Sequence, residues 1–480
     1  MIEGLKPYAE YKESGHDWIG QLPAHWSLLP NRAIFEEVKD RNHPGDEMLS
    51  VTITRGIVRQ KTLLSDTSKK DSSNINKSAY KLVQPGDIAY NKMRAWQGAL
   101  GASSLRGIIS PAYVVMRPRV KANSWFYHHL YRTPAFAKEA GRWSYGITSD
   151  MWSLRPEHFK MIYTVLPPPD EQAAIVRFLD HANRKIDRFI RAKRKLIALL
   201  GEQKQAIIHR AVTCGLNPSA PLKPSGIPWL GDIPAHWQIV PLKGACSIQS
   251  GVTLGKSYIE TRLTEFPYLR VANVQAGHLS LKKIKTLRLP VSEAKRSMLQ
   301  GGDVLMTEGG DPDKLERGCV WNGEVANCLH QNHVFAVRPS RQKMRPQYLS
   351  ALLESHYAKL YFLRTAKQTT NLASTNKTTI GQFRLLLPPI SEQDSILSCL
   401  AFELKTVVTA IARTEREIAL MREYRTRLTA DIVTGKLDVR EAAANLGEQD
   451  YTSLPEDTET TDAEALDDAG ITDETATEEI

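Results

Sequence analysis

Three short motifs have residue types that could carry out catalysis. The first, Gly251-Val-Thr-Leu-Gly255-Lys256-Ser257, resembles a loop whose backbone N–H groups wrap a phosphate. It is one residue shorter than GxxxxGK[S/T], and polar residues follow where a helix with a buried face should begin. We therefore expect a glycine turn between strands here and not an ATP site.

Two other motifs have residues in common with enzymes that cleave or methylate DNA. Cleavage at Mg²⁺ would need Pro-Asp and Asp/Glu-x-Lys to converge, but Pro169-Asp170 and Glu202-Gln203-Lys204 lie on one predicted helix. The helix holds them about 48 Å apart, so they cannot share a metal. The segments LPPP and LPPI lack the Asn or Asp that precedes the prolines of an amino-methyltransferase, and no GxGxxG, GxSxG or HExxH occurs. Together these absences favour a binding protein.

Cysteine usage and hydropathy indicate an intracellular chain. The five cysteines have wide, irregular spacings, with no CxxC pair: Cys214, Cys246, Cys319, Cys328 and Cys399. We expect mostly buried, inert thiols in a reducing compartment, without zinc or disulfides. No apolar run approaches the ~18–20 residues of a membrane helix, and residues 1–14 lack a signal pattern. The predicted location is the cytoplasm.

The chain repeats itself once. Residues 14–30 (SGHDWIGQLPAHWSLLP) and 225–241 (SGIPWLGDIPAHWQIVP) match at nine of 17 positions, where unrelated stretches would share roughly one. Two further pairs are QPGDIAYNKMR (84–94) with LQGGDVLMTEGGD (299–311), and LPPPDEQAAI (166–175) with LPPISEQDSI (387–396). Each half therefore has a Trp-rich opening segment, a mixed stretch, and then LPP with a long helix.

The mixed stretches predict an α+β globule of about 150 residues in each half. Short β-branched and aromatic runs predict strands at 48–54, 112–118 and 333–339. The turns at 85–87 and 301–303 should feed the strands DIAY and DVLM. One helix is expected near the end of each mixed stretch, at about 124–140 and 345–363, with its aromatic residues in the core. The opening segments should be irregular or short edge strands.

A long helix follows each LPP, with Asp170 and Ser391 as expected N-caps. Apolar residues recur at spacings of three and four, and these partner-binding positions are Ile175, Leu179, Ile186, Phe189 and Leu200 in the first helix and Ile396, Leu400, Val407, Ile418 and Met421 in the second. Helices of about 43 residues seldom stand alone in water. Because the first helix leads into the second globule, a second helix that pairs with it must run back. We predict an antiparallel coiled coil and a pseudo-twofold axis.

Charge is unevenly distributed along the chain. Residues 441–480 hold 14 acidic and no basic residues, so residues 1–440 carry 63 basic against 39 acidic groups. This excess suggests a polyanionic partner, because phosphate contacts release condensed counterions. The acidic end has one aromatic residue, Tyr451, and too little apolar surface to fold. We expect a disordered, solubilising tail.

Over residues 14–436 the sequence resembles the specificity subunits of type I restriction–modification systems. The motifs that carry the resemblance are the two PAHW segments, YNKMRAWQGALG (90–101), SYGITSDMWSLRPEHF (144–159), EGGDPDKLERGCVW (308–321), HQNHVFAVRP (330–339), KQTTNLASTNKTTI (367–380) and the duplicated LPPxxEQxxI helices. The resemblance implies two target-recognition domains that each read half of a split double-stranded DNA target. It also implies that the paired helices form the spacer and dock two modification subunits, which are adenine methyltransferases. It does not explain the acidic tail.

The same resemblance implies a division of labour and of the chain. S-adenosylmethionine, ATP and Mg²⁺ are expected in the modification and restriction/translocase subunits, with no cofactor, metal or catalytic residue in this chain. The expected fold is α+β, with two tandem-repeat α/β target-recognition domains separated by the two long helices. The expected segments are target-recognition domain 1 (1–168), first spacer helix (169–213), linker (214–224), target-recognition domain 2 (225–390), second spacer helix (391–436) and acidic disordered tail (437–480).

Polar loops that mix basic, amide and aromatic residues are the candidates for DNA contact, since Arg and Lys suit guanine and phosphate while Asn and Gln suit adenine. In the first half these are Lys92, Arg94, Trp96, Gln97, Tyr145, Thr148, Ser149 and Trp152. In the second half they are Glu308, Asp311, Lys314, Arg317, Gln331, Asn332, Lys367, Gln368, Thr370, Asn371, Asn376 and Lys377. Core packing is the alternative for Trp96 and Trp152. Because the two loop sets differ, the two half-sites should differ, which gives an asymmetric bipartite target.

Other interpretations stay open. The chain could serve an orphan DNA methyltransferase, or act as a coiled-coil scaffold that binds only protein. A standalone restriction enzyme is a further alternative, although the nuclease and methyltransferase motifs are missing. The basic face of the first helix is either solvated or a channel over the spacer DNA; its residues are Arg184, Lys185, Arg188, Arg191, Arg194 and Lys195.

Overall fold

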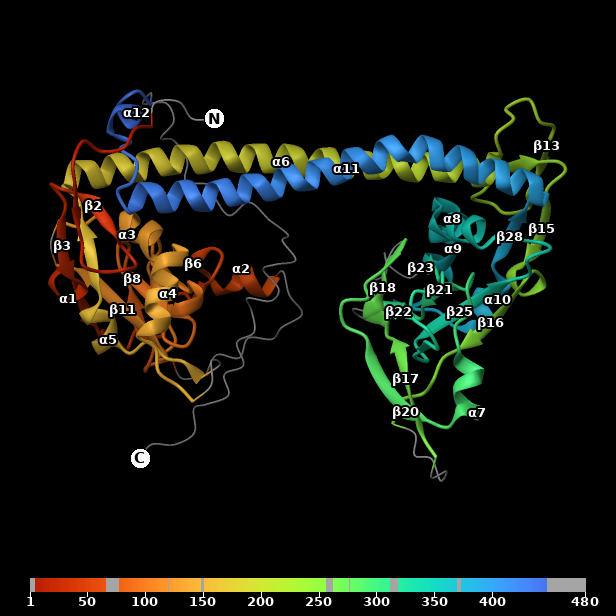
Figure 1. Cartoon of the computed structure of the whole chain (residues 1–480), viewed down its shortest axis with the longest axis horizontal. Helices are drawn as coiled ribbons and strands as arrows, with labels where there is room; N and C mark the ends of the chain where they lie inside the picture. Colours follow the sequence, from red (N-terminus) through yellow and green to blue (C-terminus); the bar gives the residue numbers. More distant parts are fainter. Residues whose placement is uncertain are drawn as a thin grey trace. The chain divides into compact units, whose positions relative to one another are not determined.

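The structure, a computed structural model, describes residues 5–65, 77–119, 121–147, 151–255, 262–275, 277–310, 318–368 and 373–446 (Figure 1). The chain forms two compact units, which we call unit 1 (residues 1–192 and 417–480) and unit 2 (residues 193–416). Two long helices, α6 (Pro169–Cys214) and α11 (Ile390–Val433), each contribute one part to each unit.

Unit 1 is an α+β globule built on a four-stranded antiparallel sheet with the order β4-β11-β8-β9. Besides α6 and α11, its elements are β1 (Tyr11–Glu13), β2 (Gln21–Pro23), β3 (Ser27–Pro30), α1 (Asn31–Ile34), β4 (Phe35–Val38), β5 (Leu49–Thr52), β6 (Gly56–Arg59), α2 (Gln60–Ser65), β7 (Lys81–Val83), β8 (Ile88–Asn91), η1 (Ala95–Gln97), β9 (Leu100–Ala102), β10 (Gly107–Ile109), β11 (Tyr113–Pro118), α3 (Ser124–Tyr131), α4 (Pro134–Arg142), α5 (Pro156–Met161), β12 (Tyr163–Leu166) and α12 (Arg440–Ala444).

Unit 2 has an equivalent antiparallel sheet, with the order β16-β25-β21-β23. Its elements are β13 (Leu222–Pro224), β14 (Asp232–Pro234), β15 (Gln238–Pro241), η3 (Leu242–Gly244), β16 (Cys246–Ser250), β17 (Thr264–Leu269), η4 (Val271–Asn273), β18 (Val274–Gln275), β19 (His278–Leu279), β20 (Lys285–Leu289), α7 (Val291–Ala294), η5 (Lys295–Ser297), β21 (Val304–Thr307), β22 (Gly309–Gly310), β23 (Gly318–Val320), β24 (Leu329–His330), β25 (Val334–Pro339), α8 (Pro346–Glu354), α9 (His356–Thr365), β26 (Lys367–Gln368), β27 (Ala373–Ser374), α10 (Lys377–Gln382) and β28 (Arg384–Leu387). The shared strand order confirms the duplicated α+β fold.

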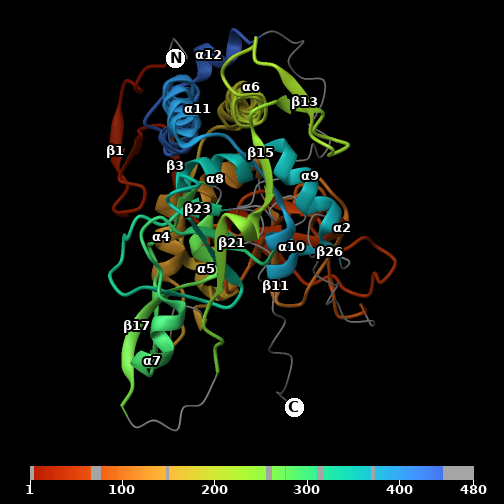
Figure 2. The same ribbon diagram turned by 90° about the vertical axis from the view of Figure 1, so that its right-hand side faces the viewer.

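The long helices pair in opposite directions, as predicted. In unit 1 the start of α6, with Ile175 and Leu179, shares a core with Leu428 and Ile432 near the end of α11. In unit 2 the end of α6 shares a core with the start of α11. The helices lie next to each other in Figures 1 and 2. Most of the predicted apolar stripe is buried, Leu200 and Met421 are half-buried, and Phe189 is exposed.

Several details differ from the predictions. The helix expected at 124–140 is two helices, because Thr133 caps a new helix that starts at Pro134. The helix expected at 345–363 is likewise divided at Ser355, the N-cap of α9. Asp170 and Ser391 are not N-caps, since α6 and α11 begin one residue earlier, at Pro169 and Ile390.

The C-terminal tail is ordered further than predicted. Residues 437–446, placed in the disordered tail from the sequence, are described, and Val439 and Ala443 are buried in the core of unit 1. The Asp438 N–H donates to the Lys6 carbonyl at 2.7 Å, and the Tyr11 hydroxyl donates to the Lys436 carbonyl at 3.1 Å. Residues 436–443 therefore hold the N-terminal segment onto the unit.

The cysteines agree with the expectation of mostly buried thiols, whereas the expectation from hydropathy needs correction. All five cysteines are free, but Cys214 is exposed and Cys399 partly exposed; burial raises the pKa of the three other thiols, Cys246, Cys319 and Cys328, to about 12. Among the described residues, α11 is long and apolar enough for a membrane span, although no such stretch was expected. Its two ends pack into the cores of the two units.

Candidate nucleic-acid interface

The first group of predicted DNA-contacting residues lies on two neighbouring loops of unit 1. One loop joins β8 to β9 through η1, and the other follows α4. The Leu154 N–H donates to the Lys92 carbonyl at 2.9 Å, which holds the loops together. The predicted residues on these loops are Lys92, Arg94, Trp96, Gln97, Tyr145 and Trp152, whereas Thr148 and Ser149 lie outside the described residues.

The two tryptophans of this group pack against each other. The ring centroids of Trp96 and Trp152 are 5.5 Å apart, edge to face, and the Trp96 Nε1–H donates to the Met93 carbonyl at 3.0 Å. A Cβ on Gly146 would lie 2.5 Å from the Met151 carbonyl, so glycine permits the close approach of the two arms of the loop. Tyr145, by contrast, is 65% exposed. The tryptophans thus position the loops, while the Tyr145 ring lies at the surface with its centroid 5.1 Å from that of His158.

The second group gathers around a small sheet of unit 2 with the order β22-β27-β26. Glu308 precedes β22, and its N–H donates to the His333 carbonyl at 2.9 Å, which holds the turn with Gln331 and Asn332 beside this sheet. Lys367 begins β26. Asp311, Lys314, Arg317, Thr370, Asn371 and the Gln368 side chain lie outside the described residues.

Two members of the second group have partners within the protein. The Glu308 carboxylate contacts His333 Nδ1 at 2.5 Å. The Asn376 side chain accepts a hydrogen bond from the Thr379 N–H at 2.9 Å and caps α10. Lys367 and Lys377 are exposed. These contacts give Glu308 and Asn376 a structural role, which the sequence alone did not reveal.

Each unit has the same ion pair, with a buried carboxylate, at the start of the strand that leads to its candidate loops. Asp87 is the aspartate of the repeated Gly-Asp turn, and Arg117 from β11 donates to its two oxygens at 2.8 and 2.9 Å. In unit 2, Arg338 from β25 donates to the two oxygens of Asp303 at 2.7 and 2.8 Å. Such forked contacts fix direction as well as distance. Because Asp87 and Asp303 come directly before β8 and β21, the pair fixes the start of the strand that leads into each candidate loop.

The remaining repeated motifs meet at the start of α6, in a contact we call the unit 1 corner. The Glu171 carboxylate accepts hydrogen bonds from Trp26 Nε1 at 2.9 Å and from the Tyr8 hydroxyl. His25 Nε2 lies 2.8 Å from its other oxygen. Burial raises the pKa of Tyr8, as does its bond to Glu171, so its hydroxyl keeps the proton that it donates. The PAHW and EQ motifs are therefore two sides of one contact.

The unit 2 corner repeats this arrangement. Glu392 accepts from Trp237 Nε1 at 3.0 Å and lies 2.7 Å from His236 Nε2. The adjacent glutamine, Gln393, accepts from the Arg345 N–H just before α8 at 2.8 Å. Its counterpart Gln172 accepts from the N–H just before α3 at 2.7 Å. Each corner thus joins a long helix to the opening segment of its own globule and to the start of α3 or α8.

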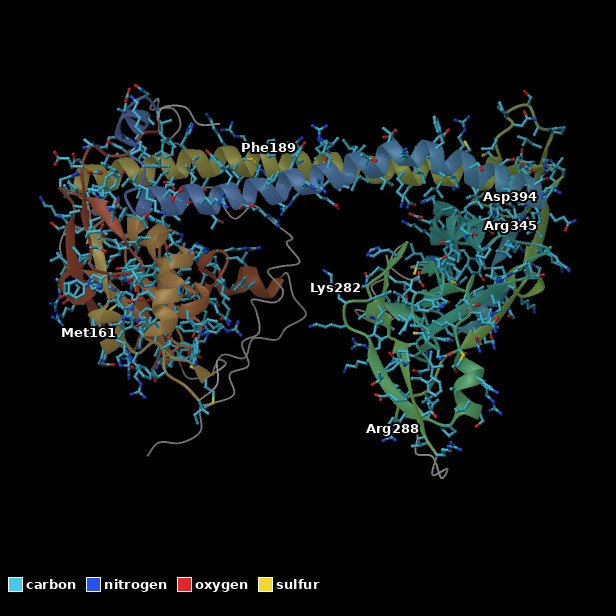
Figure 3. The ribbon with its side chains drawn as sticks, in the orientation of Figure 1. Met161, Phe189, Lys282, Arg288, Arg345 and Asp394 are labelled. Carbon is cyan, nitrogen blue, oxygen red and sulfur yellow. The ribbon has the colours of Figure 1, made fainter. Side chains whose placement is uncertain are left out.

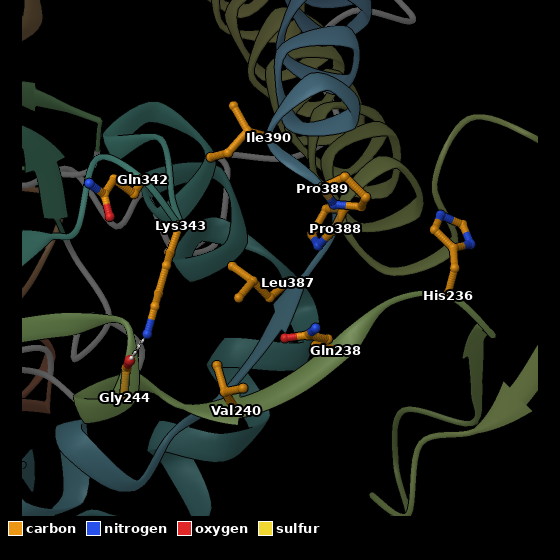
Figure 4. A pocket seen from close by; sticks show the side chains of 10 residues that line it. All are labelled: His236, Gln238, Val240, Gly244, Gln342, Lys343, Leu387, Pro388, Pro389 and Ile390. Atoms are coloured by element: carbon orange, nitrogen blue, oxygen red, sulfur yellow. Dashed lines mark hydrogen bonds between the residues drawn. The ribbon is translucent and has the colours of Figure 1, made fainter.

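A shallow hollow lies beside each corner. In unit 2 it has a volume of about 260 Å³ and is lined by His236, Lys343 and residues 387–390, with Lys343 Nζ donating to the Gly244 carbonyl at 3.2 Å (Figure 4). In unit 1 the equivalent hollow, of about 310 Å³, is lined by His25 and Lys121. The duplication therefore extends to the surface.

The phosphate-loop candidate has a structural explanation. A Cβ on Gly251 would lie 2.1 Å from the His330 carbonyl, and the neighbouring Val252 N–H donates to that carbonyl at 2.7 Å. Glycine is required for this close approach of two backbones. Lys256 and Ser257 lie outside the described residues. The described part of the motif thus joins strands, as expected.

Sequence reasoning missed one strongly basic segment. Residues 282–288 (KKIKTLR) hold four basic side chains in seven residues, all exposed on and before β20. The charge density was a usable signal, but the segment lacks the amide and aromatic residues by which the candidate loops were chosen.

Comparisons with known proteins agree on one family. The model of the type I restriction modification DNA specificity domain matches residues 234–415. The EcoKI specificity subunit of Escherichia coli (strain K12) is 22% identical over 399 residues, 79% of this chain and 82% of that protein. The StySPI specificity subunit of Salmonella potsdam is 19% identical over 394 residues, with the same shares.

A solved structure shares the fold of this chain. A chain from a solved type I restriction–modification system is 17% identical, with a TM-score of 0.56 over 86% of this chain and 98% of that chain. This likeness shows a shared fold, and the sequence likeness extends across both units. In its duplicated architecture, its sequence and its fold, the chain is thus similar to the specificity subunits of type I restriction–modification systems, which confirms the family indicated by its motifs.

Proposed function

We propose that this chain selects the DNA sequence for a type I restriction–modification enzyme, with each unit reading one half of an asymmetric bipartite target. One observation carries the proposal. Each unit has its own copy of the same sheet, the same Asp–Arg ion pair and the same corner, yet the sequences of the candidate loops differ between the units. The sequence at residues 91–101 of unit 1 is NKMRAWQGALG, whereas the sequence at residues 306–318 of unit 2 is MTEGGDPDKLERG. Variable loops on a constant scaffold are how one fold acquires two specificities.

In this proposal the chain supplies recognition and its partners supply chemistry. Two modification subunits would bind S-adenosylmethionine and methylate adenine, and restriction subunits would use ATP and Mg²⁺. Among the described residues, no group of three or more His, Cys, Asp or Glu side chains could hold a metal ion. DNA of the host lies in the cytoplasm, and we assign the complex to that compartment.

The long helices are the proposed docking surface for the modification subunits. In unit 1, Phe189 on α6 is exposed (Figure 3), and so is Leu420 on α11. In unit 2, Leu199 on α6 and Phe402 on α11 are exposed, Phe402 by 82%. Large apolar side chains in this number on charged helices favour a protein partner that covers them.

Mapping methylated adenines tests the proposal. The chain is co-expressed with its modification subunits in a host that lacks other adenine methylation, and genomic adenines are sequenced. We expect a single target with two unlike specified halves and an unspecified gap. Methylation without a gap, or two identical halves, would contradict the division between the units. Modification without this chain would show that it does not supply specificity.

A further inference from the structure

We propose that a basic ribbon in unit 2 binds the phosphates of duplex DNA independently of sequence, outside the bases that the loops read. The ribbon consists of β19, β20 and the residues 280–284 between them. Its basic residues are Lys282, Lys283, Lys285 and Arg288. The inference rests on the proposed function, because it places the DNA backbone on the same unit as the second group of candidate loops.

The charges of the ribbon are exposed and available. All four basic side chains are exposed, and none forms an ion pair with a residue that the structure describes. Figure 3 shows the side chains of Lys282 and Arg288 extending away from the backbone. The residue paired with Arg288 across the strands is Glu265, so the three lysines form the least neutralised part. An uncompensated cluster of this kind attracts a polyanion.

The backbone that carries the lysines is held in place. Asn273 is 3% exposed, and its amide nitrogen donates to the Ser280 carbonyl at 2.8 Å and to the Lys283 carbonyl at 3.2 Å. Its amide oxygen accepts from the Arg270 N–H at 2.9 Å. A buried amide with its hydrogen bonds satisfied fixes the turn before binding. Less conformational entropy is then lost when phosphates are bound.

The ribbon is also joined to the candidate loops. Strand β17 pairs with β20 on one side and with β24 on the other. The Gln331 N–H, just after β24, donates to the Leu269 carbonyl of β17 at 2.8 Å, and the Gly277 N–H donates to the Gly318 carbonyl at 3.0 Å. Two strand spacings are about 10 Å, within the roughly 12 Å width of a major groove. A duplex read at Gln331 therefore brings its backbone to the lysines.

The salt dependence of DNA binding tests this inference. The full-length variant K282Q/K283Q/K285Q is compared with wild type for binding to a random-sequence duplex, by fluorescence anisotropy over a series of KCl concentrations. Each lost phosphate contact should reduce the slope of log K against log [salt] by about 0.9, so we expect a slope shallower by roughly 2–3. The ratio of affinities for target and random duplexes should stay the same, because phosphates carry no sequence information directly.

Two controls separate position from total charge. K282R/K283R/K285R keeps the charge and should keep the wild-type slope. K243Q/R341Q/K343Q removes three exposed positive charges elsewhere in unit 2 and should change the slope by less than one. An unchanged slope in K282Q/K283Q/K285Q would overturn the proposal that the ribbon binds phosphates. A change in K243Q/R341Q/K343Q as large as that in K282Q/K283Q/K285Q would also overturn it. Loss of modification-subunit binding with an unchanged slope would also overturn it and indicate a protein contact. If wild type binds random duplex but prefers no target, the proposed function fails and the ribbon stands.

Discussion

Replacing Glu171 by alanine should destabilise unit 1 more strongly than the matched replacement destabilises unit 2. Glu171 accepts hydrogen bonds from the Trp26 indole and the Tyr8 hydroxyl, and a ring nitrogen of His25 lies next to its other oxygen. The Glu171 side chain is 2% exposed. Its counterpart Glu392 receives two donors and is 25% exposed. The E171A variant therefore leaves two buried donors without an acceptor, and E392A leaves one.

The expected magnitudes follow from these donors. A hydrogen bond to a charged acceptor contributes about 1.5–3 kcal/mol, and a buried donor left unpaired costs about 1–3 kcal/mol. We expect E171A to lower the free energy of unfolding of unit 1 by about 3–5 kcal/mol, and E392A to lower that of unit 2 by about 1–3 kcal/mol. In a unit of roughly 250 residues, the first change corresponds to a fall in Tm of about 10 °C.

Hydrogen exchange resolved by mass spectrometry suits this test, because peptides from each unit report its own opening. Peptides around Trp26 and α3 should lose protection in E171A, while those around Trp237 and α8 should stay as in wild type. E171Q keeps one acceptor oxygen, so it should lower the free energy of unfolding of unit 1 by about half as much as E171A does. The reasoning is refuted if E171A leaves exchange in unit 1 unchanged, or if E392A costs more than E171A.

Three further predictions concern Lys81, the docking surface and the spacer. Burial lowers the pKa of Lys81 to about 8, so above that pH the unfolded state binds more protons than the folded state. The free energy of unfolding of wild-type unit 1 should therefore rise by up to about 3 kcal/mol between pH 8 and 10.5. The K81M variant should lack this gain in thermal melts at the two pH values, and an identical rise would contradict the assignment. Phe402 is 82% exposed, so F402E should change Tm by less than about 2 °C. The same variant should reduce co-purification of the modification subunit at least tenfold. Unchanged co-purification would show that Phe402 is not part of the docking surface. Seven residues inserted after Ala192 and seven after Arg416 keep the heptad register and lengthen the helices by about 10 Å, so the target gap should grow by about three base pairs, and an unchanged gap in the methylation map would count against the spacer.

The fold was predictable where a pattern is local. Short apolar runs and Gly-Asp turns located β8, β11, β21 and β25, and the 3–4 spacing located α6 and α11. The break between α3 and α4 had a local signal as well, Thr133-Pro134, although one continuous helix was predicted there. The burial of Val439 and Ala443 had none, because it depends on contact with the N-terminal segment.

The candidate site was predictable as loops and less so as individual residues. The loops with Lys92, Tyr145, Gln331 and Lys367 do come together within their own units. The roles of Glu308 and Asn376, however, depend on His333 and on the start of α10, which only the fold brings near. The repeated EQ and PAHW motifs were recognised separately, and their contact through Glu171 and Glu392 needed three dimensions. The basic ribbon was missed because charge alone was given little weight.

The central claim is that each unit reads its own half of the target, and exchanging one unit tests it most directly. Residues 225–390 are replaced by the corresponding segment of an unrelated specificity subunit, and methylated adenines are mapped with the same modification subunits. We expect one specified half to change and the other half to stay as in wild type. If both halves change, or neither does, the two units do not recognise DNA independently.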